Sequence, residues 1–155
     1  MASIHREIAI EVAAERAWDA VRDVGAIHER LAPGFVVDTV LEEGGAARVV
    51  TFANGLVARE LIVDLDDETR RLAWSVVQAS RSEPKASEVH RGGRMTHHNA
   101  SLQIFAEGED RCRAVWIADL LPHELAPVIT TMIEQGLGVI KKTLEQTERE
   151  QAKVA

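Results

Sequence analysis

The sequence predicts an α+β domain that consists of a strand, two short helices, six further strands and a long C-terminal helix. Residues 4–12 alternate between apolar and polar side chains, which indicates a strand. Short segments of the same kind recur between residues 35 and 121, separated by turn-forming residues. From residue 125 to residue 144 the apolar positions follow helical spacing instead. With 155 residues, the chain suits a single domain, 1–155, built on one core.

Two short helices are expected directly after the first strand. The segment AAERAWDAVRDV places Ala14, Ala17, Trp18 and Val21 on one face of a helix. The next segment, GAIHERLAPG, ends at a proline and a glycine, and these residues stop helices.

Turn-forming residues divide the segment 35–77 into a meander of strands. Asn54-Gly55 predicts a hairpin with a type I′ turn, because both residues tolerate a positive φ. DDET at 66–69 predicts the next turn. The carboxylates around it suit turn formation and solvation, with calcium binding or catalysis as the alternative; they are Asp64, Asp66, Asp67 and Glu68.

Residues 79–94, ASRSEPKASEVHRGGR, form a long polar connection. Connections longer than about 12 residues often cover functional sites, although simple disorder is an equally common explanation. Two alternatives follow for this segment. It is a lid with Gly92-Gly93 as its hinge, or it is a disordered connection.

The C-terminal third predicts one long amphipathic helix. Pro122 or Pro127 suits its first turn, where a missing N–H group costs nothing. Charged residues dominate the chain after about residue 146, so this tail is expected to fray. The apolar positions at helical spacing are Leu125, Val128, Ile129, Met132, Ile133, Ile140 and Leu144.

Four segments, in this order and spacing, resemble the START-related, Bet v 1-like (SRPBCC) superfamily, and within it the bacterial polyketide cyclase/dehydratase-type proteins. They are ERAWDAVRDVGAIHERLAPGF, LDDETRRLAWSV, VWIADLLP and GLGVIKKTLE. The resemblance spans essentially the whole chain. It implies a helix-grip fold, in which a curved antiparallel sheet of seven strands surrounds the long helix and leaves a cavity for an apolar ligand between them. Because carriers, receptors and cyclases share this fold, the function has to be argued from the site.

Two adjacent histidines, His97 and His98, stand near the head of the strand-like segment 95–106. Successive strand residues point to opposite faces, so the two rings cannot share one cavity in a regular strand. The face that contains His98 continues through Ala100 and Leu102 and is apolar. We therefore expect His98 to face inward and His97 to face water.

The hairpin at EGED determines the expected partner of His98. A two-residue turn at Gly108-Glu109 places His98 opposite Asp119, with Cβ atoms about 4.5 to 5.5 Å apart. A hydrogen bond to this carboxylate would orient the imidazole and raise its basicity, as a general base requires. The pair is a catalytic dyad, a ligand-binding pair, or two rim residues that satisfy one another. One residue more in the turn would separate them.

The expected cavity lining comes from the sheet and the C-terminal helix. In the same register Ile117 faces inward, whereas Trp116 and Phe105 face outward, where a second copy in a homodimer could cover them. Gly136 shares a helix face with Met132, and its small size suits close packing or space for a ligand. The predicted ligand-binding residues are Trp74, His98, Ala100, Ile117, Asp119, Met132 and Gly136.

Composition argues against several functional classes. A net charge of −7 is atypical of nucleic-acid binding, which usually needs a basic face. No apolar run is long enough to span a bilayer, and the start, MASIHREIAIEV, does not resemble a signal peptide, so a cytoplasmic protein is expected. No nucleotide-binding or CxxC motif is present, and no cofactor is expected.

Metal binding and thiol chemistry are also disfavoured. Zinc held by His90, His97 and His98 would need a local bulge and further ligands, so no metal is expected. The lone Cys112 suits packing in a strand, with a reactive thiolate between two arginines as the alternative.

Two functions fit these observations, and both involve a polyketide-, lipid- or aromatic-like molecule. In the first, the protein is an enzyme of cyclisation or dehydration, in which His98 abstracts a proton adjacent to a carbonyl and Asp119 orients the imidazole. In the second, it is a non-catalytic carrier or regulatory binding protein, in which the same pair only hydrogen-bonds the ligand.

Overall fold

The computed structural model describes residues 1–81 and 95–154. Seven antiparallel strands form one open sheet in the order β1-β7-β6-β5-β4-β3-β2, so β1 and β2 are its edges. This confirms the predicted α+β helix-grip fold. The strands are β1 (Ala2–Ile10), β2 (Val36–Glu42), β3 (Ala47–Phe52), β4 (Leu56–Asp66), β5 (Arg71–Arg81), β6 (His97–Ala106) and β7 (Cys112–Leu121).

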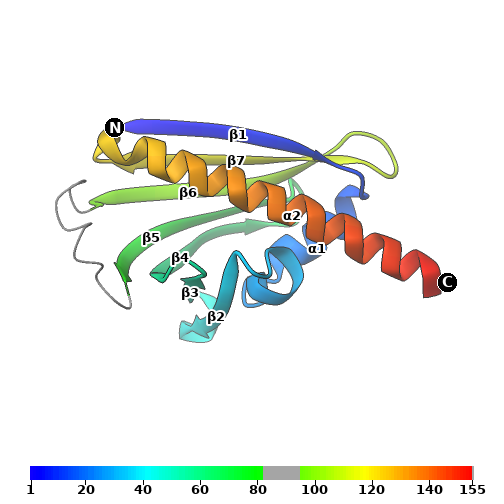
Figure 1. The fold of residues 1–155 in the computed structure, drawn as a ribbon, viewed down its shortest axis with the longest axis horizontal. Helices are drawn as coiled ribbons and strands as arrows, with labels where there is room; N and C mark the ends of the chain where they lie inside the picture. Colours follow the sequence, from blue (N-terminus) through cyan, green and yellow to red (C-terminus); the bar gives the residue numbers. More distant parts are fainter. Residues whose placement is uncertain (82–94, 155) are drawn as a thin grey trace.

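The long helix α2 (Ala126–Val154) crosses one face of the curved sheet (Figure 1). Its first turn contains Pro127, as the sequence predicts. Its apolar stripe is buried against the sheet and the short helices, which forms the core of the domain. The buried positions of this stripe are Ile129, Ile133, Gly136, Leu137, Ile140 and Leu144.

The tail after residue 146 is helical rather than frayed, because α2 continues to Val154. Side-chain pairs support this last part of the helix. Gln146 donates a hydrogen bond to Glu150 at 3.3 Å, and Glu148 lies 3.1 Å from Arg16 of the first helix. The contact with α1 therefore helps to keep the end of α2 helical, although the charged sequence after residue 146 predicts fraying.

The remaining helical elements of the described residues are short and lie in the connections between the other elements. They are α1 (Ala14–Arg22), the π-helical turn η1 (Ile27–Leu31), and two 3-10 turns, η2 (Glu43–Gly45) and η3 (His123–Leu125). The two predicted helices after the first strand are thus α1 and η1. The turn η1 packs against α2, and α1 packs against η1 and β6 (Figure 1). In the part of the chain that the structure describes, no helix has the length and apolar character needed to cross a membrane.

The acidic residues at the β4–β5 turn have structural roles. Asp66 accepts hydrogen bonds from the backbone N–H of Glu68 and from the hydroxyl of Thr69, as turn residues typically do. Asp67 accepts hydrogen bonds from the Trp18 indole and from Arg22, both at 2.8 Å. The turn therefore holds α1 in place, in agreement with the structural interpretation of this cluster.

The β3–β4 hairpin forms where Asn54-Gly55 predicts it, but its turn is not type I′. Of these two residues only Gly55 has a positive φ, 88°. The loop has three residues, from Ala53 to Gly55, and the Asn54 side chain accepts a hydrogen bond from the backbone N–H of Leu56. A three-residue loop needs a positive φ only at its last position, which the glycine supplies.

The β6–β7 hairpin also differs from the predicted turn by one residue. Glu107 donates a backbone hydrogen bond to Arg111, so the loop contains three residues, 108–110, rather than two. The register consequently pairs His98 with Leu120 and Asn99 with Asp119. Because side chains alternate along a strand, this single residue reverses the predicted faces of all of β7.

Candidate functional site

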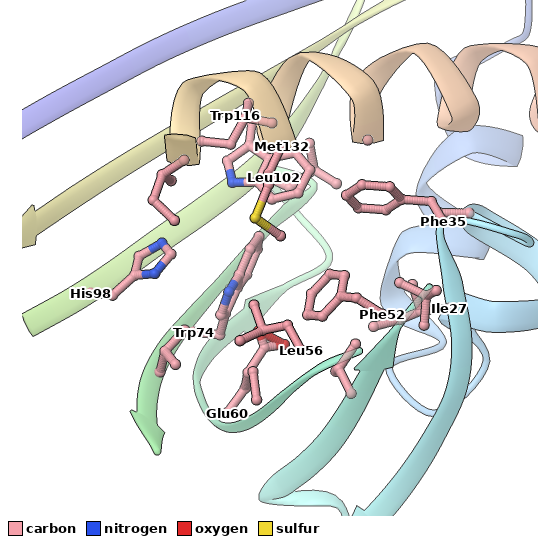
Figure 2. Close-up of a pocket in the computed structure, with 18 of the residues that line it drawn as sticks. Ile27, Phe35, Phe52, Leu56, Glu60, Trp74, His98, Leu102, Trp116 and Met132 are labelled. Atoms are coloured by element: carbon pink, nitrogen blue, oxygen red, sulfur yellow. The ribbon is translucent and has the colours of Figure 1, made fainter. Parts of the chain in front are cut away.

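A cavity of about 110 Å³ lies between the inner face of the sheet and α2, with η1 and β2 closing one side (Figure 2). Its walls are formed mostly by aliphatic and aromatic side chains. Two aromatic pairs meet edge to face, Trp74 with Trp116 at 5.7 Å and Phe35 with Phe52 at 5.5 Å between ring centroids. Four rings from separate parts of the chain therefore surround one small apolar space.

Gly136 allows α2 to lie close to two of these rings. A Cβ atom at this position would lie 3.1 Å from Cζ3 of Trp116 and 3.2 Å from Cε1 of Phe35, which is closer than ordinary van der Waals contact. Gly138, one residue beyond Leu137, would meet nothing within 4 Å. Of the two helix glycines, Gly136 is the one that close packing against the cavity requires.

Arg48 and Glu60 place a buried ion pair in a mostly apolar wall. They are directly opposed in the β3–β4 hairpin, and Nε of Arg48 donates a hydrogen bond of 3.0 Å to Oε1 of Glu60. The Arg48 guanidinium also lies 5.4 Å from the centroid of the Trp74 ring and donates to the carbonyl oxygen of Val24 at 3.3 Å. These contacts hold the arginine in one orientation at the cavity.

Burial raises the pKa of the Glu60 carboxyl, and the adjacent Arg48 guanidinium opposes that rise. Our sequence reasoning missed this pair. A signal was present, since the two charges interrupt the apolar faces of consecutive strands, although only the observed three-residue loop sets them directly opposite one another. Opposite charges on the inner faces of two consecutive strands are the feature that could have identified the pair.

His98 lines the cavity from β6, on the other side of Met132 from the two phenylalanines (Figure 2). Desolvation, with a smaller contribution from the charge of neighbouring His97, lowers the pKa of His98 to about 4. The imidazole is therefore neutral near pH 7. It can donate or accept a hydrogen bond, but it is a weak base at that pH.

The predicted pairing of His98 with Asp119 is wrong. Asp119 lies opposite Asn99, on the face of the sheet away from the cavity, so it cannot orient the imidazole or raise its basicity. The extra residue in the β6–β7 loop is the cause, and it moves Ile117 to the outer face as well. The dyad on which the sequence-based mechanism depends is absent from this geometry.

Trp116 takes the position that the sequence assigned to Ile117. It faces inward opposite Leu102 and lines the cavity, so its predicted outward orientation is wrong for the same reason. Phe105 does face outward and is 36% exposed. Only one of the two aromatic residues proposed for a homodimer surface is therefore on that surface.

The other predicted ligand-binding residues lie on the expected side of the sheet. Trp74, His98, Met132 and Gly136 line the cavity. Ala100 is buried on the same inner face, directly opposite Trp74, but it does not contribute to the lining.

The proposed metal and lid residues lie partly or wholly outside the described chain. Within residues 1–81 and 95–154, no three histidine, cysteine or acidic side chains cluster closely enough to hold a metal ion. His90 of the alternative zinc set lies outside these ranges, as do residues 82–94, including Gly92-Gly93, on which the lid and disorder alternatives depend. Cys112 is fully buried, and burial raises the pKa of its thiol to about 11, which agrees with a packing role.

Comparison with known proteins assigns the chain to a family. Residues 1–145 match the family model described as polyketide cyclase / dehydrase and lipid transport. No protein with a curated description matches the chain in sequence.

Several solved structures share the fold at low sequence identity. The protein XoxI from Bacillus cereus is 17% identical with a TM-score of 0.78, and the alignment covers 96% of this chain and 99% of that one. A START superfamily protein from Mycobacterium smegmatis is 14% identical, with a TM-score of 0.65 and 96% and 97% of the two chains covered. Norcoclaurine synthase from Thalictrum flavum, solved with dopamine and hydroxybenzaldehyde, is 18% identical, with a TM-score of 0.66 and 96% and 87% covered.

These structural matches establish the fold and not the activity, because identities this low say nothing of the ligand. The family match compares the sequence itself with a family model, and it covers residues 1–145. It also confirms the resemblance to the polyketide cyclase/dehydratase-type proteins stated from the sequence. The chain belongs to the polyketide cyclase / dehydrase and lipid transport family.

Proposed function

We propose that this protein binds a small apolar molecule, about the size of one aromatic ring, in the cavity between the sheet and α2. The observation that carries the proposal is a space of about 110 Å³ with an apolar, ring-rich wall between the sheet and α2. Well-packed interiors contain few voids larger than a water molecule, so a space of this size needs an explanation. Its position, between sheet and long helix, is also where the family resemblance expects a ligand.

Cavity volume limits the size of the ligand. An apolar cavity of about 150 Å³ in another protein stays dry and binds benzene, so a space of this order suits one ring with a small substituent. A long lipid chain or a multi-ring polyketide exceeds this space and would have to extend out of it or push the walls apart. Among polyketide-, lipid- and aromatic-like ligands, the aromatic class therefore has the strongest support. Norcoclaurine synthase, of the same fold, was solved with two single-ring compounds.

The ionisable groups in the wall favour an uncharged ligand. Arg48 and Glu60 neutralise one another, and His98 is neutral near pH 7 because its pKa is about 4. A charged ligand would lose its hydration without gaining an unpaired counter-ion from these three groups, and such a loss is costly.

Ligand binding can be tested with a cavity-filling variant and its neighbour. Val76 lines the cavity, whereas the adjacent Val77 is 49% exposed, so Val76→Phe inserts a ring into the cavity and Val77→Phe adds the same ring outside. We expect toluene to perturb the NMR signals of the cavity residues in the wild type and in Val77→Phe, but not in Val76→Phe. Native mass spectrometry of the protein as isolated would identify any co-purified ligand. Equal responses in the two variants would contradict binding in this cavity.

Catalysis of a cyclisation or dehydration is a second candidate, supported by Glu60. A buried carboxyl with a raised pKa is a common form of catalytic acid or base, and this one is in the cavity wall. Acetophenone provides a test, because abstraction of a proton next to its carbonyl exchanges the methyl hydrogens for deuterium in D₂O. Exchange that the wild type accelerates and Glu60→Gln does not would support catalysis. If acetophenone binds but its methyl hydrogens exchange no faster than in buffer alone, the result would contradict catalysis and favour a carrier or regulatory binding protein.

A further inference from the structure

The indole nitrogen of Trp116 is a buried hydrogen-bond donor without an acceptor among the described residues. Buried polar atoms are nearly always paired, and each exception needs an explanation. An indole N–H can only donate, so its missing partner has to be an acceptor atom.

The position of the Trp116 ring directs this donor toward the cavity. The Cζ3 edge of the ring lies under Gly136 of α2, and Nε1 is on the opposite edge of an indole. In Figure 2 the nitrogen lies on the side of the ring toward His98, away from Phe35. Trp74 packs edge to face against Trp116, so contacts from two sides hold the ring in this orientation.

We propose that the ligand of this protein is a neutral aromatic molecule that bears a carbonyl or ether oxygen, and that this oxygen accepts a hydrogen bond from Nε1 of Trp116. The inference rests on the proposed function and adds a polar group to the ligand. A simple hydrocarbon would fill the cavity but leave the indole donor unpaired. An oxygen substituent pairs it without introducing a charge into the apolar wall.

His98 can supply a second contact to the same oxygen or to a hydroxyl group beside it. Its imidazole lines the same cavity and is neutral, so one ring nitrogen donates and the other accepts. The two side chains extend from neighbouring strands, β7 and β6, which the backbone holds in fixed register.

Acetophenone and α-methylstyrene form a matched pair of probes, because they have nearly the same shape and differ by C=O against C=CH₂. The chain has three tryptophans, so a ¹⁵N-labelled sample has three indole N–H signals, and that of Trp116 is identified by through-bond assignment. We expect acetophenone to move the Trp116 signal downfield, as formation of a hydrogen bond does, and α-methylstyrene not to. This measurement needs no variant.

Trp116→Phe then measures the contribution of the hydrogen bond. Losing one hydrogen bond of ordinary strength corresponds to about a three- to tenfold change in affinity. The variant should therefore weaken acetophenone binding about three- to tenfold more than it weakens α-methylstyrene binding, because both probes lose the same ring contacts. Trp18→Phe is the control, since the Trp18 indole pairs with Asp67 outside the cavity and its loss should affect both probes equally.

The outcomes separate this inference from the function on which it rests. If both probes bind and the Trp116 signal responds to neither, or if Trp116→Phe weakens both equally, the inference is overturned and ligand binding stands. If neither probe binds the wild type, the proposed function fails and the inference fails with it.

Discussion

Arg48 and Glu60 form an ion pair with only 4% and 6% of their side chains exposed, in the wall of a mostly apolar cavity. Removing both charges from water is costly, and their attraction repays that cost only when the geometry is good. Here the hydrogen bond of 3.0 Å, the carbonyl oxygen of Val24 and the ring of Trp74 supply that geometry. The stability of the protein consequently depends on the presence of both members of the pair.

Removal of one partner should destabilise the protein strongly. We expect Arg48→Met to lower the free energy of unfolding by about 3 kcal/mol near neutral pH, because it leaves Glu60 buried and unpaired. The double variant Arg48→Met/Glu60→Leu should recover much of this loss. Urea denaturation curves measure both. A double variant no more stable than Arg48→Met would show that the pair does not act as a unit.

The loss in Arg48→Met should also depend on pH. Burial already raises the pKa of Glu60, and without the arginine the folded-state pKa rises further above its unfolded value. Stability is then retained at low pH, where the carboxyl is protonated in both states, and is lost as pH rises through the folded-state pKa. The difference between wild type and variant should be smaller at pH 4 than at pH 8. A difference that is constant with pH would contradict a buried, unpaired carboxylate.

His98 should make the protein less stable in mild acid. Its pKa is about 4 in the folded state, against about 6.5 in an unfolded chain, so the unfolded state binds more protons between these values. Above about pH 6.5 the imidazole is neutral in both states, and the free energy of unfolding has its full value. As pH falls toward 4, the free energy of unfolding decreases by at most about 3 kcal/mol. His98→Asn should remove this part of the pH dependence, whereas the adjacent His97→Asn should remove only the smaller share that comes from the His97 charge.

An NMR titration of the histidine signals tests the corrected register directly. A dyad with Asp119 would raise the pKa of His98, whereas desolvation lowers it to about 4. Because Asp119 lies on the other face, Asp119→Asn should leave the His98 midpoint unchanged. A midpoint that falls in Asp119→Asn would restore the pairing expected from the sequence.

The two glycines of α2 should respond differently to the same substitution. Alanine is better than glycine in a helix by about 1 kcal/mol, and Gly138→Ala meets nothing within 4 Å, so it should stabilise the protein by about that amount. Gly136→Ala forces Trp116 or Phe35 to move, so it should be at least about 1 kcal/mol less stable than Gly138→Ala. It should also weaken probe binding in the cavity. Thermal unfolding compares the two, and equal stabilities would contradict the close contact.

Cys112 should be inert until the protein unfolds. Its side chain is fully buried, and burial raises the pKa of the thiol to about 11, so about a thousandth of it is ionised at pH 8. Its reaction with DTNB at pH 8 should be at least about 100-fold slower in buffer than in denaturing urea. A fast reaction in buffer would support the reactive-thiolate alternative.

Local patterns in the sequence were sufficient for the fold. The alternation in β1, the helical spacing in α2 and the turns at 54–55 and 66–69 each depend on a few neighbouring residues. These signals fix the type and order of the elements. They also place His98, Trp74, Met132 and Gly136 on inner faces, because the face of a residue within its own strand or helix follows from periodicity alone.

Relations between elements were decided by the tertiary structure. One extra residue in the β6–β7 loop moved Asp119 and Ile117 outward and Trp116 inward, since a strand has a period of two and a single shift exchanges its faces. The depressed pKa of His98 and the buried Arg48–Glu60 pair depend on how completely distant segments exclude water. The sequence alone therefore determined which elements form and which side of each is apolar, whereas only packing decided which side chains meet around the cavity.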